Sequence, residues 1–145
     1  MSRDRTDRAA ALAAIALAAA LSAGSAAADP LGDARNILCT VLDTHVCVEA
    51  AGCVDVLAEE LNIPRFIQVD TRAKKLSTTE ASGENRETTV DAVQRDAGQI
   101  TLQGVESGRA FSLFISESTG LATFASAAEG RSVAVFGICT PVPMK

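Results

Sequence analysis

Four cysteines and a single histidine are the residues of this chain whose chemistry is most evident. The cysteines are Cys39, Cys47, Cys53 and Cys139, and His45 lies between the first two. Thiolate and imidazole groups are zinc ligands, yet no Cys-x-x-Cys knuckle holds two of them close together. On an unbroken strand Cys39 and Cys47 would lie some 26 Å apart, at ~3.3 Å per residue. We therefore expect no metal site, no redox-active cysteine pair and no cofactor.

The same cysteines can form two disulfides, for which three pairings exist. Cys47 and Cys53 flank a segment that can turn at Gly52, which favours a bridge between them and leaves Cys39 to pair with Cys139. The alternative, Cys39–Cys47 with Cys53–Cys139, stays open at this stage. In the chain-entropy model, a bridge that closes about 100 residues adds up to ~4–5 kcal/mol to the stability, and the short bridge adds ~2 kcal/mol.

His45 is also the only histidine, so an acid–base mechanism near neutral pH would use it or a perturbed carboxylate. Asp43 shares its strand face and would orient the imidazole. Ser112 and Ser116 are candidate nucleophiles, but neither lies in a Gly-x-Ser-x-Gly elbow. No glycine loop at a strand-to-helix junction is present to bind phosphate. These residues favour a protein that is not an enzyme, with a hydrolase using His45 as an alternative.

The first 28 residues have the pattern of a secretory signal peptide. Arginines near the start precede an uncharged, alanine-rich run from 9 to 21 and small residues that end in Ala-x-Ala. This run is shorter than the ~20 residues that a membrane-spanning helix needs. We expect cleavage after Ala28 and a mature chain without a membrane anchor. It would be periplasmic or secreted, in a compartment where disulfides persist.

The remaining length suits one domain. We expect a flexible mature N-terminus over 29–36, a single β domain over 37–141 and a tail over 142–145. The whole chain has a net charge of −5 and contains no Trp and no Tyr. An acidic domain that is poor in aromatic side chains argues against binding to nucleic acid. It equally lacks the basic surface that attracts an anionic membrane.

Short runs typical of β-strands alternate with turn residues from residue 37 onward. The expected strands are 37–48, 65–70, 75–79, 88–94, 99–105, 110–116, 121–126 and 131–139. Each of the last four connections places a glycine late in the turn, where a positive φ is wanted. This spacing predicts an all-β fold, an antiparallel meander that forms a small barrel or a strongly curled sheet. Both rows of the last strand are largely apolar, so we expect it to be central or covered on both faces.

Two segments interrupt the meander. Residues 54–61 fit a strand or a two-turn helix that stops before Pro64, and their paired glutamates favour a short helix near 54–62. Residues 80–87 are polar and are expected to form an exposed loop.

Charged residues at the strand ends have a structural interpretation. Arg65, Arg109 and Arg131 are expected to be solvated charges in turns or at strand edges. Asp70 ends an apolar strand and is expected to cap the turn that follows. None of them is predicted to be a site residue.

Three short motifs are distinctive. They are the spacing Cys47-x5-Cys53, the sequence Ile-Pro-Arg-Phe-Ile-Gln-Val-Asp at 63–70 and the ending Phe-Gly-Ile-Cys-Thr-Pro at 136–141. In these motifs the chain resembles small, exported, uncharacterised β-rich proteins of proteobacteria. The resemblance implies a bacterial periplasmic setting and brings no activity with it.

Together these features predict a non-enzymatic exported β-domain that binds a partner protein or a small apolar ligand. The alternative is an inhibitor of an extracytoplasmic hydrolase, in which the loop 80–87 inserts into the enzyme. An apolar cavity inside the sheet would favour ligand binding. A filled interior with a protruding, ordered loop would favour inhibition.

Overall fold

The computed structural model describes residues 30–143. The predicted signal peptide, residues 1–28, lies outside the described residues, and so does the end of the predicted tail. Within the described part, no helix is long and apolar enough to cross a membrane.

The described chain consists of β-strands joined by turns and two short 3-10 helices. The strands are β1 (Asn36–Val48), β2 (Gly52–Asp55), β3 (Phe66–Asp70), β4 (Lys75–Thr78), β5 (Glu87–Thr89), β6 (Ala92–Asp96), β7 (Gln99–Glu106), β8 (Arg109–Ser116), β9 (Leu121–Ala128) and β10 (Arg131–Pro141). The 3-10 helices are η2 (Ala58–Leu61) and η3 (Glu80–Ser82). The all-β fold predicted from the sequence is confirmed.

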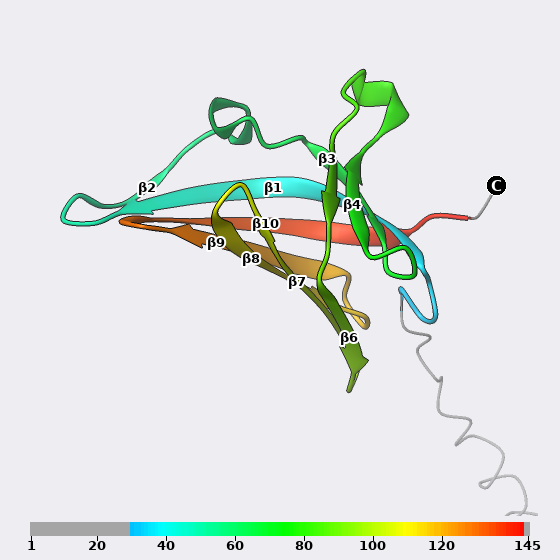
Figure 1. The fold of residues 1–145 in the computed structure, drawn as a ribbon. Coiled ribbons are helices and arrows are strands. Elements are labelled where there is room, and N and C mark those ends of the chain that lie inside the picture. Colours follow the sequence, from blue (N-terminus) through cyan, green and yellow to red (C-terminus); the bar gives the residue numbers. More distant parts are fainter. Residues whose placement is uncertain (1–29, 144–145) are drawn as a thin grey trace, which may run out of the picture.

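All strands belong to one antiparallel sheet. Its order is β5-β4-β3-β1-β10-β9-β8-β7-β6. The short strand β2 pairs with the C-terminal end of β1, beyond the part of β1 that pairs with β3. Apart from the pairings of β1 with β10 and with β3, neighbours along this path follow one another along the chain, as in a meander. The sheet curls into a half-barrel, with the strands wrapped around one concave side (Figure 1).

One continuous segment, residues 87–96, joins the two edges of the sheet. Its first part, β5, pairs with β4, and its second part, β6, pairs with β7. At the change of partner, the Val90 amide donates to the Lys74 carbonyl and the Asp91 amide to the Gln103 carbonyl, each over 2.9 Å. Val90 is 1% exposed and fills the space between the two edges. The half-barrel is therefore closed near this segment.

Two segments differ in detail from the sequence prediction. The strand expected over 88–94 is divided into β5 and β6, because its two halves pair with opposite edges of the sheet. The segment 54–61, for which a helix was favoured over a strand, contains both elements. Val54 and Asp55 extend β2 along β1, and the single turn of η2 follows.

The hairpin turns after β6 and β7 are tighter than the four-residue connections expected from the sequence. Asp96 pairs with Gln99, which leaves only Ala97 and Gly98 between the strands. Both turn residues have positive φ, 50° and 76°. Positive φ at both positions matches the right-handed twist of a two-residue hairpin, and glycine adopts it without strain. The β7–β8 turn has the same form.

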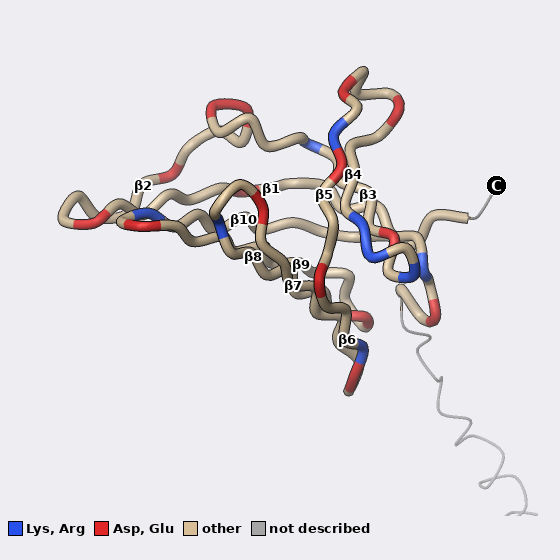
Figure 2. Tube along the Cα trace, viewed as in Figure 1, with Lys and Arg blue, Asp and Glu red and all other residues tan. Residues whose placement is uncertain are grey.

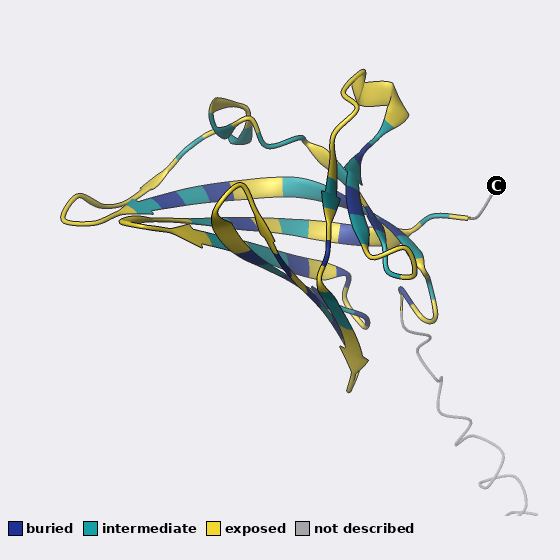
Figure 3. Cartoon of the chain, in the orientation of Figure 1, coloured by how far each residue is buried: buried dark blue, intermediate teal, exposed yellow. Residues whose placement is uncertain are grey.

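The hydrophobic core lies inside the curl, toward the end that 87–96 closes. The alternate residues Phe111, Leu113 and Ile115 of β8 face this interior. The most deeply buried side chains of the core are Ile37, Val69, Val90, Ile100, Leu102 and Ile115. The hairpin tips at the other end of the sheet are exposed (Figure 3).

The convex face of the sheet is not covered by any described element. β10 is central, between β1 and β9, which agrees with one of the two expectations for this strand. Its concave row includes Val135, which is 4% exposed, whereas Phe136 and Ile138 on the convex row are 43% and 45% exposed. The two apolar rows of β10 therefore reflect its central position in the sheet, and no second layer of described structure covers its convex row.

Candidate functional site

The structure contains two disulfides, in the pairing that the sequence favoured. Cys39 of β1 and Cys139 of β10 are direct cross-strand partners, with their Cα atoms 4.0 Å apart. Cys47 and Cys53 are opposite each other in the β1–β2 hairpin. None of the four cysteines is free. All four sulfurs are therefore held in disulfide bonds.

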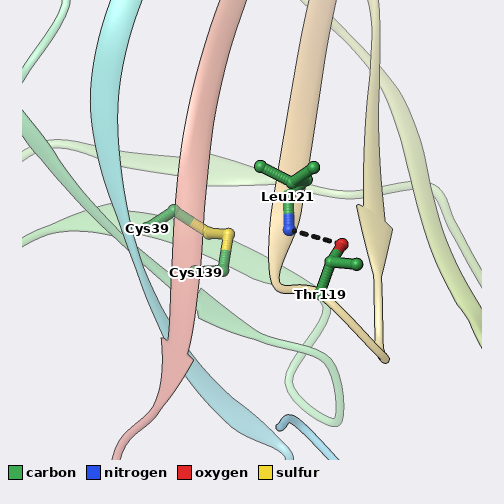
Figure 4. Close-up of a disulfide and its surroundings, with 4 residues drawn as sticks. All are labelled: Cys39, Thr119, Leu121 and Cys139. Carbon is green, nitrogen blue, oxygen red and sulfur yellow. Dashed lines mark hydrogen bonds between the residues drawn. A yellow bond between two sulfur atoms is a disulfide. The ribbon is translucent and has the colours of Figure 1, made fainter. Parts of the chain in front are cut away.

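The long disulfide also fixes the turn between β8 and β9 (Figure 4). In that turn the Thr119 hydroxyl accepts a hydrogen bond from the Leu121 amide over 3.2 Å. The carbonyl of Gly120 in turn accepts a bond from the Cys139 amide over 2.7 Å. The bridge and these hydrogen bonds hold three strands in register at one place.

His45 lies on the convex face, between two carboxylates. Its Nδ1 is 2.6 Å from Oδ1 of Asp55, and its Nε2 is 3.9 Å from Oδ2 of Asp43. The imidazole and the Phe136 ring also pack nearly at right angles, with their centroids 5.6 Å apart. Asp43 was the predicted partner, but Asp55 makes the shorter contact. The favoured disulfide could have identified Asp55 as the partner. When Cys47 is opposite Cys53 in an antiparallel hairpin, His45 is opposite Asp55.

The candidate nucleophiles are not brought to His45. In register, His45 is beside Ala134, Ala134 is beside Ala125, and Ala125 is beside Ser112. Three strand spacings of ~4.8 Å separate the two backbones by about 14 Å, so no hydrogen bond joins them. Ser116 lies further along the same strand, where its hydroxyl is 3.3 Å from that of Ser118. The arrangement forms no Ser–His pair for nucleophilic catalysis.

A cleft of about 590 Å³ opens on the concave side, next to the filled core. Its floor is apolar and comes from β8, β9 and β10, with Phe111, Leu113, Phe124, Val133 and Val135. The rings of Phe111 and Phe124 stack with their centroids 5.8 Å apart. Pockets of roughly 300–1,000 Å³ with apolar walls are typical of small-molecule sites.

The segment that follows η2 forms the opposite wall of the cleft. Residues 60–64 line it, and the guanidinium of Arg86 holds them in place through a 2.8 Å bond from Nη1 to the Asn62 carbonyl. Arg86 also pairs with Glu84, with Nε 3.2 Å from Oε2. The end of η2 and the three residues after it thus cover one side of the cleft.

Two arginines that the sequence suggested to be solvated charges line the cleft. Arg109 begins β8 on the same face as Phe111, and Arg131 begins β10 on the same face as Val133. The sequence contained a signal for this position. Each arginine is two residues before a residue of the cleft floor, and residues two apart on a strand lie on the same face of the sheet. Charged residues otherwise gather mainly on turns and strand ends, with few in the strand centres (Figure 2).

The loop between β4 and β5 projects away from the sheet (Figure 1). Thr78 fixes its base, since its hydroxyl donates to the Glu84 carbonyl over 2.5 Å and accepts from the Arg86 amide over 3.1 Å. The Ser82 hydroxyl donates to the Thr79 carbonyl over 2.6 Å. The polar segment predicted as an exposed loop is therefore exposed and internally hydrogen-bonded.

The turn cap predicted at Asp70 can also be located. Asp70 caps the β3–β4 turn, where its Oδ1 accepts from the amides of Arg72 and Ala73 over 2.9 and 2.7 Å. Among residues 30–143, no three histidine, cysteine or acidic side chains form a group that could hold a metal ion.

Comparison of the chain with protein-family models, with curated proteins and with solved structures finds no match.

Proposed function

We propose that this protein is a non-enzymatic, exported binding domain that holds a small apolar ligand in the cleft of its half-barrel. The observation that carries the proposal is the cleft itself. It combines an apolar floor with a volume of about 590 Å³, directly beside a core that is already filled. The ligand would cover apolar side chains that water otherwise contacts, which favours binding at roughly 25 cal/mol per Å² of apolar surface buried.

Export is part of the proposal. Two disulfides are consistent with an oxidising compartment outside the cytoplasm, because cytosolic thiols are kept reduced. The predicted signal peptide, with cleavage after Ala28, supports delivery to the periplasm or to the medium.

The test is a titration of the oxidised protein with Nile red, an uncharged dye whose fluorescence rises in apolar surroundings. We expect saturable binding, which Ser126→Phe should weaken strongly because Ser126 lines the cleft and a ring there occupies part of the space above the floor. The matched control is Ala125→Phe, which adds the same ring one residue away, on the exposed convex face. Equal loss in both variants, or no saturable binding by the parent protein, would contradict the proposal.

A second candidate function is inhibition of an extracytoplasmic hydrolase. The projecting, hydrogen-bonded β4–β5 loop favours it, since a preorganised loop loses little entropy when it inserts into an active site. The protein would be assayed against a panel of secreted proteases and glycosidases, with a variant in which 80–85 is replaced by two glycines. Inhibition that depends on the loop would support this function, and absence of inhibition across the panel would count against it.

A further inference from the structure

We propose that the ligand of the cleft is an amphiphile with an anionic head group, which Arg109 and Arg131 bind at the rim while the floor receives its apolar tail. This inference rests on the proposed function and specifies the chemical class of the ligand.

The two arginines lie in one row across three strands. Arg131 is the cross-strand partner of Ala128, and Ala110 is the partner of Ala127, which places Arg109 on the other side of Ala128. Two strand spacings of ~4.8 Å separate their backbones by about 10 Å. The residue between them is an alanine, so one small anion above Ala128 is within reach of both guanidinium groups.

Neither arginine forms an ion pair with the part of the chain that the structure describes. Within residues 30–143, no carboxylate lies within 4.0 Å of the guanidinium of Arg109 or Arg131, whereas Arg86, on the opposite wall, is paired with Glu84. The carboxylates that line the cleft belong to Glu60 and Glu106. Glu106 is the neighbour of Arg109 in the hairpin, but its Oε1 already accepts a 2.6 Å bond from the Thr88 hydroxyl.

The apolar floor begins immediately below the arginine row. Along β8 the side chains that face the cleft are Arg109, then Phe111, then Leu113, and along β10 they are Arg131, then Val133, then Val135. Four residues of strand span about 13 Å at ~3.3 Å per residue. The cleft therefore has a charged end and an apolar end, separated by a distance that suits an alkyl chain of medium length.

The net charge of the chain is negative, so long-range attraction cannot account for binding of an anion. The preference has to come from direct hydrogen bonds between the head group and the two guanidinium groups. Such charge-assisted bonds are roughly twice as strong as neutral ones, and the planar guanidinium matches the two oxygens of a carboxylate or phosphate.

Isothermal titration calorimetry on the oxidised protein tests the inference. The four probes share a twelve-carbon tail, and each is kept below its micelle concentration or, for the alcohol, below its solubility limit. The probes are dodecanoate, dodecyl phosphate, dodecanol and dodecyltrimethylammonium. We expect at least one anionic probe to bind roughly tenfold more tightly than dodecanol, and the cation to bind most weakly. The tighter of the two anions identifies the head group as a carboxylate or a phosphate.

The outcomes separate the two proposals. If all four probes bind with equal affinity, the anion preference is wrong and the proposed function stands. If none of them binds and Nile red also fails to bind, the proposed function is wrong as well.

Substitution of the arginines supplies the second measurement. Arg109→Gln and Arg131→Gln should each weaken binding of the preferred anion by about three- to tenfold and leave dodecanol binding unchanged. The control is Arg72→Gln, in the β3–β4 turn outside the cleft, which should change neither. Unchanged anion binding in both cleft variants, or an equal loss for dodecanol, would overturn the role of the arginines.

Discussion

Gly104 of β7 lies directly opposite Phe111 of β8, and the phenyl ring occupies the space that a side chain at position 104 would fill. A Cβ atom on Gly104 would lie 2.6 Å from Cζ and 2.8 Å from Cε1 of Phe111. The ring is 7% exposed and stacks on Phe124 in the floor of the cleft. The floor therefore depends on a glycine in a neighbouring strand.

Substitution of this glycine should disturb both stability and binding. Gly104→Ala forces the Phe111 ring to move, and overpacking of this kind costs about 1–3 kcal/mol. We expect a lower unfolding free energy in urea and weaker Nile red binding. Adding Phe111→Leu to Gly104→Ala should recover part of the stability, because the smaller side chain no longer meets the new methyl group. If the loss of unfolding free energy in the double variant equals the sum of the losses in the two single variants, the steric contact between position 104 and Phe111 is contradicted.

The two disulfides should differ in their contribution to stability. Replacing Cys39 and Cys139 by serine opens a loop of 100 residues and should lower the unfolding free energy by ~4–5 kcal/mol, against ~2 kcal/mol for Cys47 and Cys53. Denaturant unfolding of the two double variants beside the parent protein measures the difference. Equal midpoints for the two variants would contradict the chain-entropy explanation.

The same bridges should also differ in their accessibility to reductant. Cys39 and Cys139 are 6% and 5% exposed, whereas Cys53 is on the surface. Under mild reducing conditions without denaturant, alkylation and peptide mass mapping should therefore find Cys47 and Cys53 labelled first. Labelling of Cys139 at the same rate would show that the folded domain does not protect its long bridge.

Gly120 should be the least replaceable of the turn glycines. Its φ is +73°, and a Cβ atom there would overlap the carbonyl oxygen of Cys139. Gly98 has nearly the same φ, +76°, with no atom within 4 Å of its Cβ position, so it is a matched control for backbone strain alone. We expect Gly98→Ala to lose about 1 kcal/mol and Gly120→Ala to lose a further ~1–3 kcal/mol. Thermal or urea unfolding measures both, and equal losses would rule out the steric explanation.

His45 should have no influence on the cleft. It lies on the convex face, and its partner Asp55 is largely exposed, so the pair contributes at most ~1 kcal/mol to stability. We expect His45→Ala to leave Nile red binding unchanged and to shift the unfolding midpoint only slightly. A large loss of binding would show that the two faces of the sheet are coupled.

Much of the fold was predictable from local sequence. Runs typical of strands predicted β7 to β10, and glycines such as Gly98 and Gly108 marked the hairpins, because strand propensity and positive φ are properties of a few consecutive residues. The spacing of Cys47 and Cys53 favoured the short bridge for the same reason. The polar loop between β4 and β5 was predicted from its composition alone.

The tertiary structure decided what local patterns could not. The sequence predicts one strand where β5 and β6 pair with opposite edges of the sheet, since closure depends on the accumulated curvature of the whole sheet. The sequence also suggested that Arg109 and Arg131 were separate solvated charges. They come together beside Ala128 only because three antiparallel strands are held in one register, and such a register is set by long-range pairing. The cleft exists for the same reason: the sequence by itself determined which side chains share a face, and the curl of the sheet decided what that face encloses.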